Sequence, residues 1–324
     1  MAGTRRGFLW AWLALAAAFG AALALGATSG WDSEIITSLR LPRALMGVAV
    51  GAGLAVAGAA LQAIFTNPLC EPYTLGISSG AALGAVVGAV LGLAGPAWST
   101  AGLALPALLG AMVFAAALNT VAARSSRGRV GVSGAGLLLA GVMLQFLGAS
   151  LVALWMGLTD AQGVQAAVTW LLGDLSRARL EGAVFTLAGV LALGFVIWAR
   201  SRELDALLLG EEDAVSIGVD VARARRRLMF VTSFLVALCV SAAGMVGFIG
   251  LVVPHFARRV AGPLHRRLLP MCALGGATAL LLSDLLARKL AAPYELPAGV
   301  VTGLLGAPLF LWIIVRKPAE VVRG

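Results

Sequence analysis

The chain has 324 residues and a formal net charge of +9, yet only 12% of its residues are charged and 60% are hydrophobic. Soluble domains carry about twice that charged fraction, so the composition excludes an ordinary soluble protein. Apolar runs of about 20 residues match helices that cross a bilayer, whereas barrel strands would alternate polar and apolar residues. We therefore expect an all-α integral membrane protein. Its basic residues are of the kind that sets topology, and we expect no nucleic-acid partner.

The whole chain, 1–324, reads as one transmembrane domain of about ten helices. The expected spans lie at about 8–26, 42–65, 74–95, 101–123, 134–156, 182–199, 228–246, 247–256, 268–287 and 297–315. The run at 247–256 is expected to be a short or broken helix. The first run is too long for a cleaved signal peptide, so we expect it to be retained. The segment 162–175 is too short and too polar to cross, which predicts an interfacial helix with Trp170 at headgroup level.

Orientation follows from the distribution of Lys and Arg. Alternating ten spans from a cytoplasmic N-terminus places 18 of the 24 basic residues on the cytoplasmic side, which favours cytoplasmic N- and C-termini. The basic residues left outside are Arg40, Arg43, Arg177, Arg179, Arg288 and Lys289. A weak inverted repeat is also present. The spacing from Gly58 to Pro68 equals that from Gly244 to Pro254, and inverted repeats with interrupted helices are common in transporters.

Few residues offer catalytic chemistry. The two histidines, His255 and His265, lie in or beside a basic loop, and the sequence has no HExxH or P-loop motif. Asp284 is the one acid inside an apolar run, and Arg288 four residues later predicts an ion pair that places the helix end. We expect a protein that is not an enzyme and binds no cofactor or metal. ATP-driven work would need another polypeptide.

The cysteines and the apolar spans further limit the kinds of functional site that the sequence allows. Cys70, Cys239 and Cys272 lack CxxC spacing and are interpreted as small packing residues. The spans offer no carboxylate relay for proton coupling, so a pathway would be neutral and lined by small residues. The segment 200–227 predicts two short cytoplasmic helices at 203–220, which either contact a partner or form a solvated amphipathic loop.

The stretch 40–84, which contains RLPR and TNPLCEPYTLGISSG, resembles the signature of the FecCD-type permeases. These are membrane subunits of bacterial ATP-binding-cassette importers for iron–siderophore complexes, heme and vitamin B12. The resemblance continues through 207–219, 242–262 and 268–314. It implies a type II importer fold in the bacterial inner membrane, a second permease subunit (a homodimer), two cytoplasmic ATPases that bind ATP and Mg, and an extracytoplasmic substrate-binding protein.

The resemblance also implies roles for particular residues. Those implied in docking of the binding protein are Arg40, Arg43 and Arg288, with anchoring in lipid headgroups as the alternative. Those implied in coupling to the ATPases are Gly210, Glu211, Glu212, Asp213, Ala214 and Gly218. Those implied at the pathway or inner gate are Ser78, Ser79, Ser133, Gly134, Ala135 and Gly136. The run at 133–136 lacks the hydroxyls of B12-type members.

The polar stretch 66–80 is similar to the family's turn between its second and third spans. Pro68 and Pro72 end helix geometry, and Asn67 and Glu71 are expected to satisfy the backbone groups that this releases. The implied function is import by alternating access. Ferric siderophore is the expected substrate, with heme or vitamin B12 as alternatives and an oxyanion more remote. A secondary transporter and a non-transporting membrane scaffold remain rival readings.

Overall fold

The computed structural model describes residues 2–25, 33–92, 100–125, 134–290 and 294–316, and every regular element within these ranges is helical. Ten helices match the expected runs. They are α1 (Ala2–Ala24), α3 (Leu41–Ile64), α4 (Ile77–Val90), α5 (Thr100–Ser125), α6 (Gly134–Met156), α8 (Leu180–Ala199), α11 (Val221–Ala243), α12 (Ile249–Ala261), α13 (His265–Leu290) and α14 (Ala298–Arg316). The all-α prediction is confirmed for the described ranges.

Seven candidate spans are long and apolar enough to cross a membrane, counted over the residues that the structure describes. They are built on α1, α3 with its preceding turns, α5, α6, α8, α11 and α13. Helices α4 and α14 are shorter apolar helices, and α12 has 13 residues. The protein is therefore a multi-pass membrane protein, while the count of ten spans and the cytoplasmic position of both termini stay predictions.

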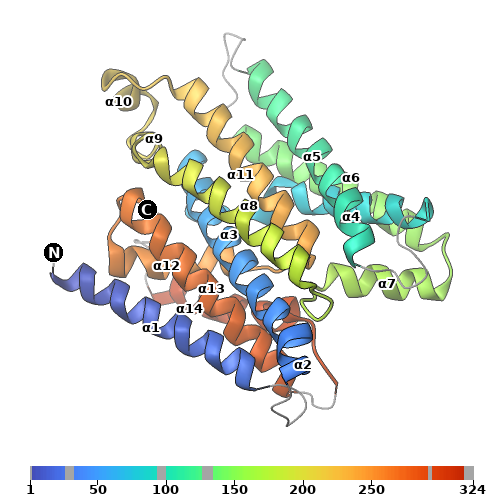
Figure 1. Ribbon diagram of the computed structural model, residues 1–324. Helices are drawn as coiled ribbons and strands as arrows, with labels where there is room; N and C mark the ends of the chain where they lie inside the picture. Colours follow the sequence, from blue (N-terminus) through green and yellow to red (C-terminus); the bar gives the residue numbers. More distant parts are fainter. Residues whose placement is uncertain (1, 26–32, 93–99, 126–133, 291–293, 317–324) are drawn as a thin grey trace.

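Short helices lie at the ends of the bundle. They are α2 (Ser33–Ile35), the π-helical turn η1 (Ile36–Arg40), the 3-10 turn η2 (Pro72–Leu75), α7 (Ala161–Leu171), α9 (Ser201–Leu207) and α10 (Glu211–Ser216). In Figure 1, α9 and α10 lie at the upper left and the start of α1 at the left, whereas α2 lies at the lower right and α7 at the right. The two short helices expected within 200–227 are thus present as α9 and α10.

Helix α7 forms where an interfacial helix was expected, but the expected place of Trp170 was wrong. Asp160 caps the helix, because its carboxylate accepts a hydrogen bond from the Gly163 backbone N–H at 2.9 Å. The Trp170 side chain is only 9% exposed and belongs to the main hydrophobic core. Its carbonyl oxygen lies against Gly244, where α11 ends. Trp170 thus packs inside the protein, and headgroup contact does not describe it.

Helix α3 is the centre of the bundle. It packs against α8, α11, α12 and α13, and 83% of the residues in its most apolar 18-residue segment are buried. Small residues make these crossings possible: a Cβ atom at Gly51 would overlap the carbonyl of Gly276, and one at Gly58 would overlap the carbonyl of Gly250. Close backbone approach through small residues is the usual way in which helices associate in a bilayer.

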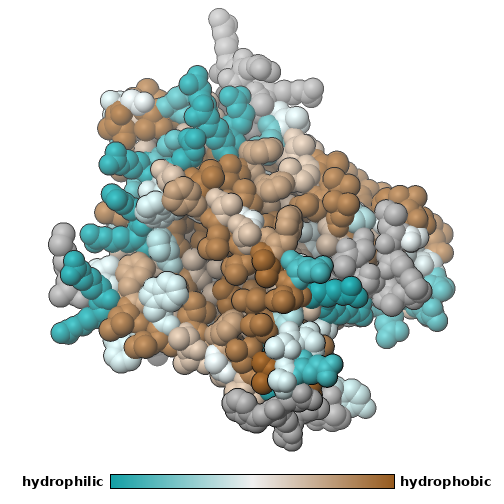
Figure 2. Space-filling view, in the orientation of Figure 1, coloured by the Kyte–Doolittle hydropathy of each residue, from teal (hydrophilic) through white to brown (hydrophobic). Residues whose placement is uncertain are grey.

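The outer helices present apolar side chains to the surroundings. In the most apolar 18-residue segment of each helix, only 11% of the residues of α1 and 22% of those of α6 and α8 are buried within the protein. In Figure 2 a hydrophobic band crosses the middle of the visible face, with hydrophilic side chains gathered toward the upper left and the left edge and, across the band, toward the lower right. This pattern is that of a helical membrane protein, since lipid-facing surfaces are apolar and the ends that meet water are polar.

Candidate functional site

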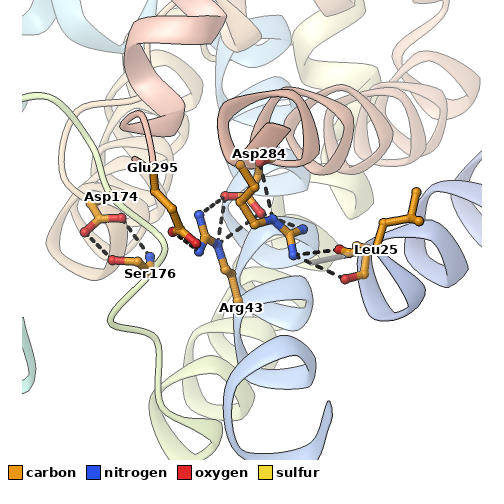
Figure 3. A network of polar contacts seen from close by, with 8 residues as sticks. Leu25, Arg43, Asp174, Ser176, Asp284 and Glu295 are labelled. Atoms are coloured by element: carbon orange, nitrogen blue, oxygen red, sulfur yellow. Dashed lines mark hydrogen bonds and ion pairs between the residues drawn. The ribbon is translucent and has the colours of Figure 1, made fainter. Parts of the chain in front are cut away.

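A buried cluster of charges joins the ends of three helices (Figure 3). Arg43, near the start of α3, holds the carboxylate of Asp284 in α13, with Nε at 3.0 and 3.1 Å from its two oxygens and Nη2 at 2.9 Å from Oδ1. Nη1 of Arg43 also lies 2.6 Å from Oε2 of Glu295. Asp284 is 1% exposed, whereas the Glu295 side chain is 36% exposed. Arg43 therefore has one buried partner and one that water reaches.

Arg288 shares the same carboxylate and extends the cluster to α1. Its Nη2 lies 3.0 Å from Oδ2 of Asp284, and its Nη1 donates to the carbonyls of Ala22 and Leu25 at 3.3 Å. This confirms the ion pair predicted between Asp284 and Arg288. The last carbonyls of a helix lack partners within it and carry partial negative charge, so a guanidinium there is stabilising.

Arg40 approaches the same end of α1. Its Nη1 donates to the carbonyl oxygens of Leu23 and Ala24 at 3.0 and 3.1 Å. Two arginines from distant segments thus cover the carbonyls at the end of α1, and Asp284 bridges α13 to α3. The cluster holds the ends of α1, α3 and α13 together.

The three arginines expected to dock the binding protein are brought together, but they are buried. Arg40, Arg43 and Arg288 are 5%, 8% and 3% exposed. Headgroup anchoring does not suit side chains so enclosed. Their role in docking stays a prediction, which now requires that a partner reach guanidinium groups already engaged within the chain. Glu295 was missed in the sequence analysis, where its one signal was an acid two residues before Pro297 in the connection before α14.

The connection between α3 and α4 meets the break between α11 and α12. The Glu71 carboxylate accepts a hydrogen bond from the Phe248 N–H, and the Tyr73 hydroxyl accepts one from the Val246 N–H. Gln62 donates to the Gly250 carbonyl at 3.3 Å. Phe248 has a φ of 67°, a left-handed conformation that is uncommon for a bulky side chain. The polar stretch is therefore the partner that satisfies a broken helix.

The expectation for the polar side chains of this connection is confirmed. Asn67 accepts a hydrogen bond from the Leu69 N–H at 2.9 Å, and Glu71 satisfies a freed N–H of the other break. Burial raises the pKa of Glu71, and the hydrogen bond from Phe248 opposes that rise. Glu71 lies between α3 and α4, outside the spanning helices. The inverted repeat stays a prediction, although its two breaks pack against each other.

The expected coupling residues lie on and around α10. Gly210 and Gly218 flank the helix with φ of 103° and 84°, which glycine adopts at no steric cost. Ala214 is fully buried, while Glu211, Glu212 and Asp213 are exposed. Exposed apolar side chains accompany these acids, with Leu209 58%, Val215 62% and Ile217 60% exposed. An exposed surface of this composition suits contact with another protein.

Residues of the expected pathway are only partly described. Ser78 is 2% exposed, and its hydroxyl has no hydrogen-bond partner within the described chain. Ser79 donates to the Gly76 carbonyl at 2.9 Å. Gly134, Ala135 and Gly136 form the first turn of α6, and Ser133 lies outside the described residues. Their role at a gate stays a prediction.

The chain belongs to the FecCD transport family, whose model matches residues 8–316. It is 39% identical over 313 residues to the hemin transport system permease protein HmuU of Yersinia pestis, covering 94% of this chain and 92% of that protein. It is 40% identical over 304 residues to the cobalamin import system permease protein BtuC of Halobacterium salinarum, covering 94% and 79%.

The fold agrees with this membership. A solved structure, described as an inward-facing conformation of a metal-chelate type ABC transporter, superposes with a TM-score of 0.85 at 31% identity. The match covers 95% of this chain and 98% of the other. The protein is therefore a permease of the ABC importer class, a transport subunit that spans the membrane several times.

Proposed function

We propose that the chain is the permease subunit of an inner-membrane importer for a bulky metal chelate, and that partner ATPases drive it by alternating access. The similarity to HmuU and BtuC over almost the whole chain carries the proposal. Heme and cobalamin are the cargo named for these relatives, so both stand beside the ferric siderophore expected from the sequence. All three are metal ions enclosed in a large organic ligand, and cargo of this kind suits a permissive pathway without charged side chains.

Nucleotide chemistry is assigned to separate subunits. ATP and Mg would bind to two cytoplasmic ATPases, and α9 and α10 would contact them through the exposed surface of Leu209, Val215 and Ile217 and the neighbouring acids. This composition supports the assignment, because an apolar patch rimmed by charges is typical of a protein contact. Helix α10 is tied to α11 by an ion pair, in which Nη1 of Arg225 lies 2.8 Å from Oε1 of Glu211.

The remaining partners are a second copy of the permease and an extracytoplasmic binding protein. The binding protein would dock over the cluster of Arg40, Arg43 and Arg288. Three arginines against Asp284 and Glu295 leave a net positive charge there, which would attract an acidic partner and steer its approach. The binding protein would deliver the chelate to the passage, which the ATPases then open to one side and afterwards to the other.

Uptake into proteoliposomes tests the proposal. The permease, reconstituted with its ATPase and binding protein, should accumulate one of radiolabelled heme, cobalamin or ferric siderophore when ATP and Mg are enclosed with the ATPase. Accumulation that follows an imposed ion gradient without ATP would identify a secondary transporter. Absence of uptake for every chelate, in complexes that assemble fully, would favour the scaffold reading.

A further inference from the structure

The first turn of α13 is completed by side chains from other helices. The residues before it are Gly262, Pro263 and Leu264, none of which has a side chain that accepts a hydrogen bond from a helix N-terminus. Asp205, from α9, supplies the acceptor. Its Oδ1 accepts from the His265 backbone N–H at 2.9 Å and lies 2.7 Å from Nδ1 of the same residue. Because a carboxylate only accepts, Nδ1 carries the proton in this contact.

A side chain from α8 supplies a second hydrogen bond that the first turn of α13 lacks. Pro270 has no N–H, so it cannot donate to the carbonyl of Arg266 four residues earlier. The indole N–H of Trp198, in the last turn of α8, donates to that carbonyl at 3.0 Å. The start of α13 thus depends on two side chains that flank the α8–α9 junction. A shift of α9 would remove the cap and strain this turn.

The other end of α13 lies in the arginine cluster. The helix is continuous over 26 residues, which corresponds to about 39 Å at 1.5 Å per residue. Near its far end Asp284 binds Arg43 and Arg288. The α9–α13 contact is buried on one side, since His265 is 0% exposed. The Glu211–Arg225 pair that ties α10 to α11 has a glutamate side chain that is 66% exposed, so it contributes little rigidity.

We propose that Asp205 and Trp198 are positioning residues that transmit movement of the α9–α10 unit into α13, and through α13 to the arginine cluster. The inference rests on the proposed function, because it takes α9 and α10 as the contact with the ATPases. The step is mechanical: Asp205 and His265 move together because two hydrogen bonds from one residue converge on one carboxylate oxygen. A route of contacts therefore leads from α9 and α10 through α13 to the arginine cluster at its far end.

The contacts of Asp205 and Trp198 with the first turn of α13 are called the joint below. Hydrogen exchange on the permease alone tests this joint without any partner. Asp205→Ala should speed amide exchange in the first turn of α13, at residues 265–269, while the second half of α13 keeps its protection. Asp160→Ala is the matched control, since it removes a helix cap of the same kind from α7 at the other end of the bundle. Unchanged exchange at 265–269 in Asp205→Ala would overturn the joint.

The functional arm uses the full complex and compares basal with binding-protein-stimulated ATPase activity. Asp205→Ala and Trp198→Phe should each lower the ratio of stimulated to basal activity by about fivefold, the lower end of coupling between distant sites. His265→Asn keeps a donor near the position of Nδ1 and should preserve the ratio, whereas His265→Leu should lose it. Asp160→Ala should keep the ratio of the unmodified complex.

The outcomes separate the joint from a merely structural role and from the proposed function. If Asp205→Ala assembles with the ATPase and retains the full ratio, the transmission role is wrong. If Asp205→Ala fails to assemble, His265→Leu and Trp198→Phe decide, and a normal ratio in both rejects the proposal. If the unmodified complex shows no stimulation, the proposed function fails, while the exchange result still decides whether the joint exists.

Discussion

Arg43 and Asp284 are 241 residues apart in the sequence and form a buried ion pair, with Nη2 and Oδ1 2.9 Å apart. Arg288 binds the other carboxylate oxygen at 3.0 Å. One aspartate thus pairs with two arginines, and these arginines also connect to α1 and to Glu295. Since charges enclosed in a protein are tolerated only when they are paired, this carboxylate is the central group of the cluster.

Asp284→Asn should strongly destabilise the protein. The substitution keeps the size of the side chain but leaves two guanidinium groups without their shared anion, and losing one partner of a buried pair costs about 3–5 kcal/mol. The apparent melting temperature in detergent would report the loss. Asp174→Asn, at the same end of the bundle, removes a carboxylate that accepts hydrogen bonds from Ser176 and should have a small effect. Equal melting temperatures for the two variants would contradict the assignment.

Glu295→Gln should separate docking from stability. The Glu295 side chain is 36% exposed, so its pair with Arg43 contributes at most about 1 kcal/mol to stability. Removing its charge raises the positive potential around Arg43, so the binding protein should associate faster, and more so at low salt. Surface plasmon resonance on permease in nanodiscs measures this rate. An association rate that is unchanged at every salt concentration would argue against docking over this cluster.

Glu71→Gln should change how stability depends on pH. Burial raises the pKa of Glu71 in the folded protein, so the folded state keeps this proton to higher pH than the unfolded state does. Stability from this group is therefore greatest below its ordinary pKa and is lost as pH rises through the raised folded value. The glutamine keeps an acceptor for the Phe248 N–H and should flatten that slope.

Melting temperatures, measured from below the ordinary pKa of a glutamate to above the raised pKa of Glu71, test the assignment of Glu71. Glu181→Gln serves as the control, because Glu181 is exposed at the start of α8. A slope that persists in Glu71→Gln and matches that of the control would show that another group is responsible.

Gly58→Ala should destabilise the crossing of α3 and α12. The added Cβ would overlap the backbone of Gly250, which cannot rotate away as a side chain would, and overpacking of this kind costs about 1–3 kcal/mol. Gly182→Ala is the matched control in α8, because no atom lies within 4 Å of the added Cβ. Melting temperatures of the two variants in the same detergent provide the test, and an equal or smaller loss in Gly58→Ala would contradict this packing.

Local sequence patterns predicted the helices well. Runs of apolar residues located the ten helices that match them, and the acidic turn after Gly210 located α10, because both signals lie within one segment of chain. The pair of Asp284 and Arg288 was predictable for the same reason, since residues four apart on a helix are neighbours.

Contacts between distant segments were not predictable in this way. Nothing near Asp205 indicates that it caps α13, and nothing near Arg43 indicates that it meets Asp284 and Glu295. The error at Trp170 has a related cause: an amphipathic aromatic beside a polar segment suits a membrane interface, but burial against the end of α11 decides its place. Composition reports the type of environment a residue favours, while the packing of helices decides which neighbour supplies it.

The most direct test of the central claim is ATPase activity. The permease, reconstituted in lipid with its ATPase, would be titrated with its binding protein, either empty or loaded with heme, cobalamin or ferric siderophore. The account predicts that one loaded form stimulates hydrolysis above the empty form, which would establish coupling and name the cargo. Hydrolysis that is indifferent to every loaded form, in complexes shown to be fully assembled, would contradict the role of importer permease for a metal chelate.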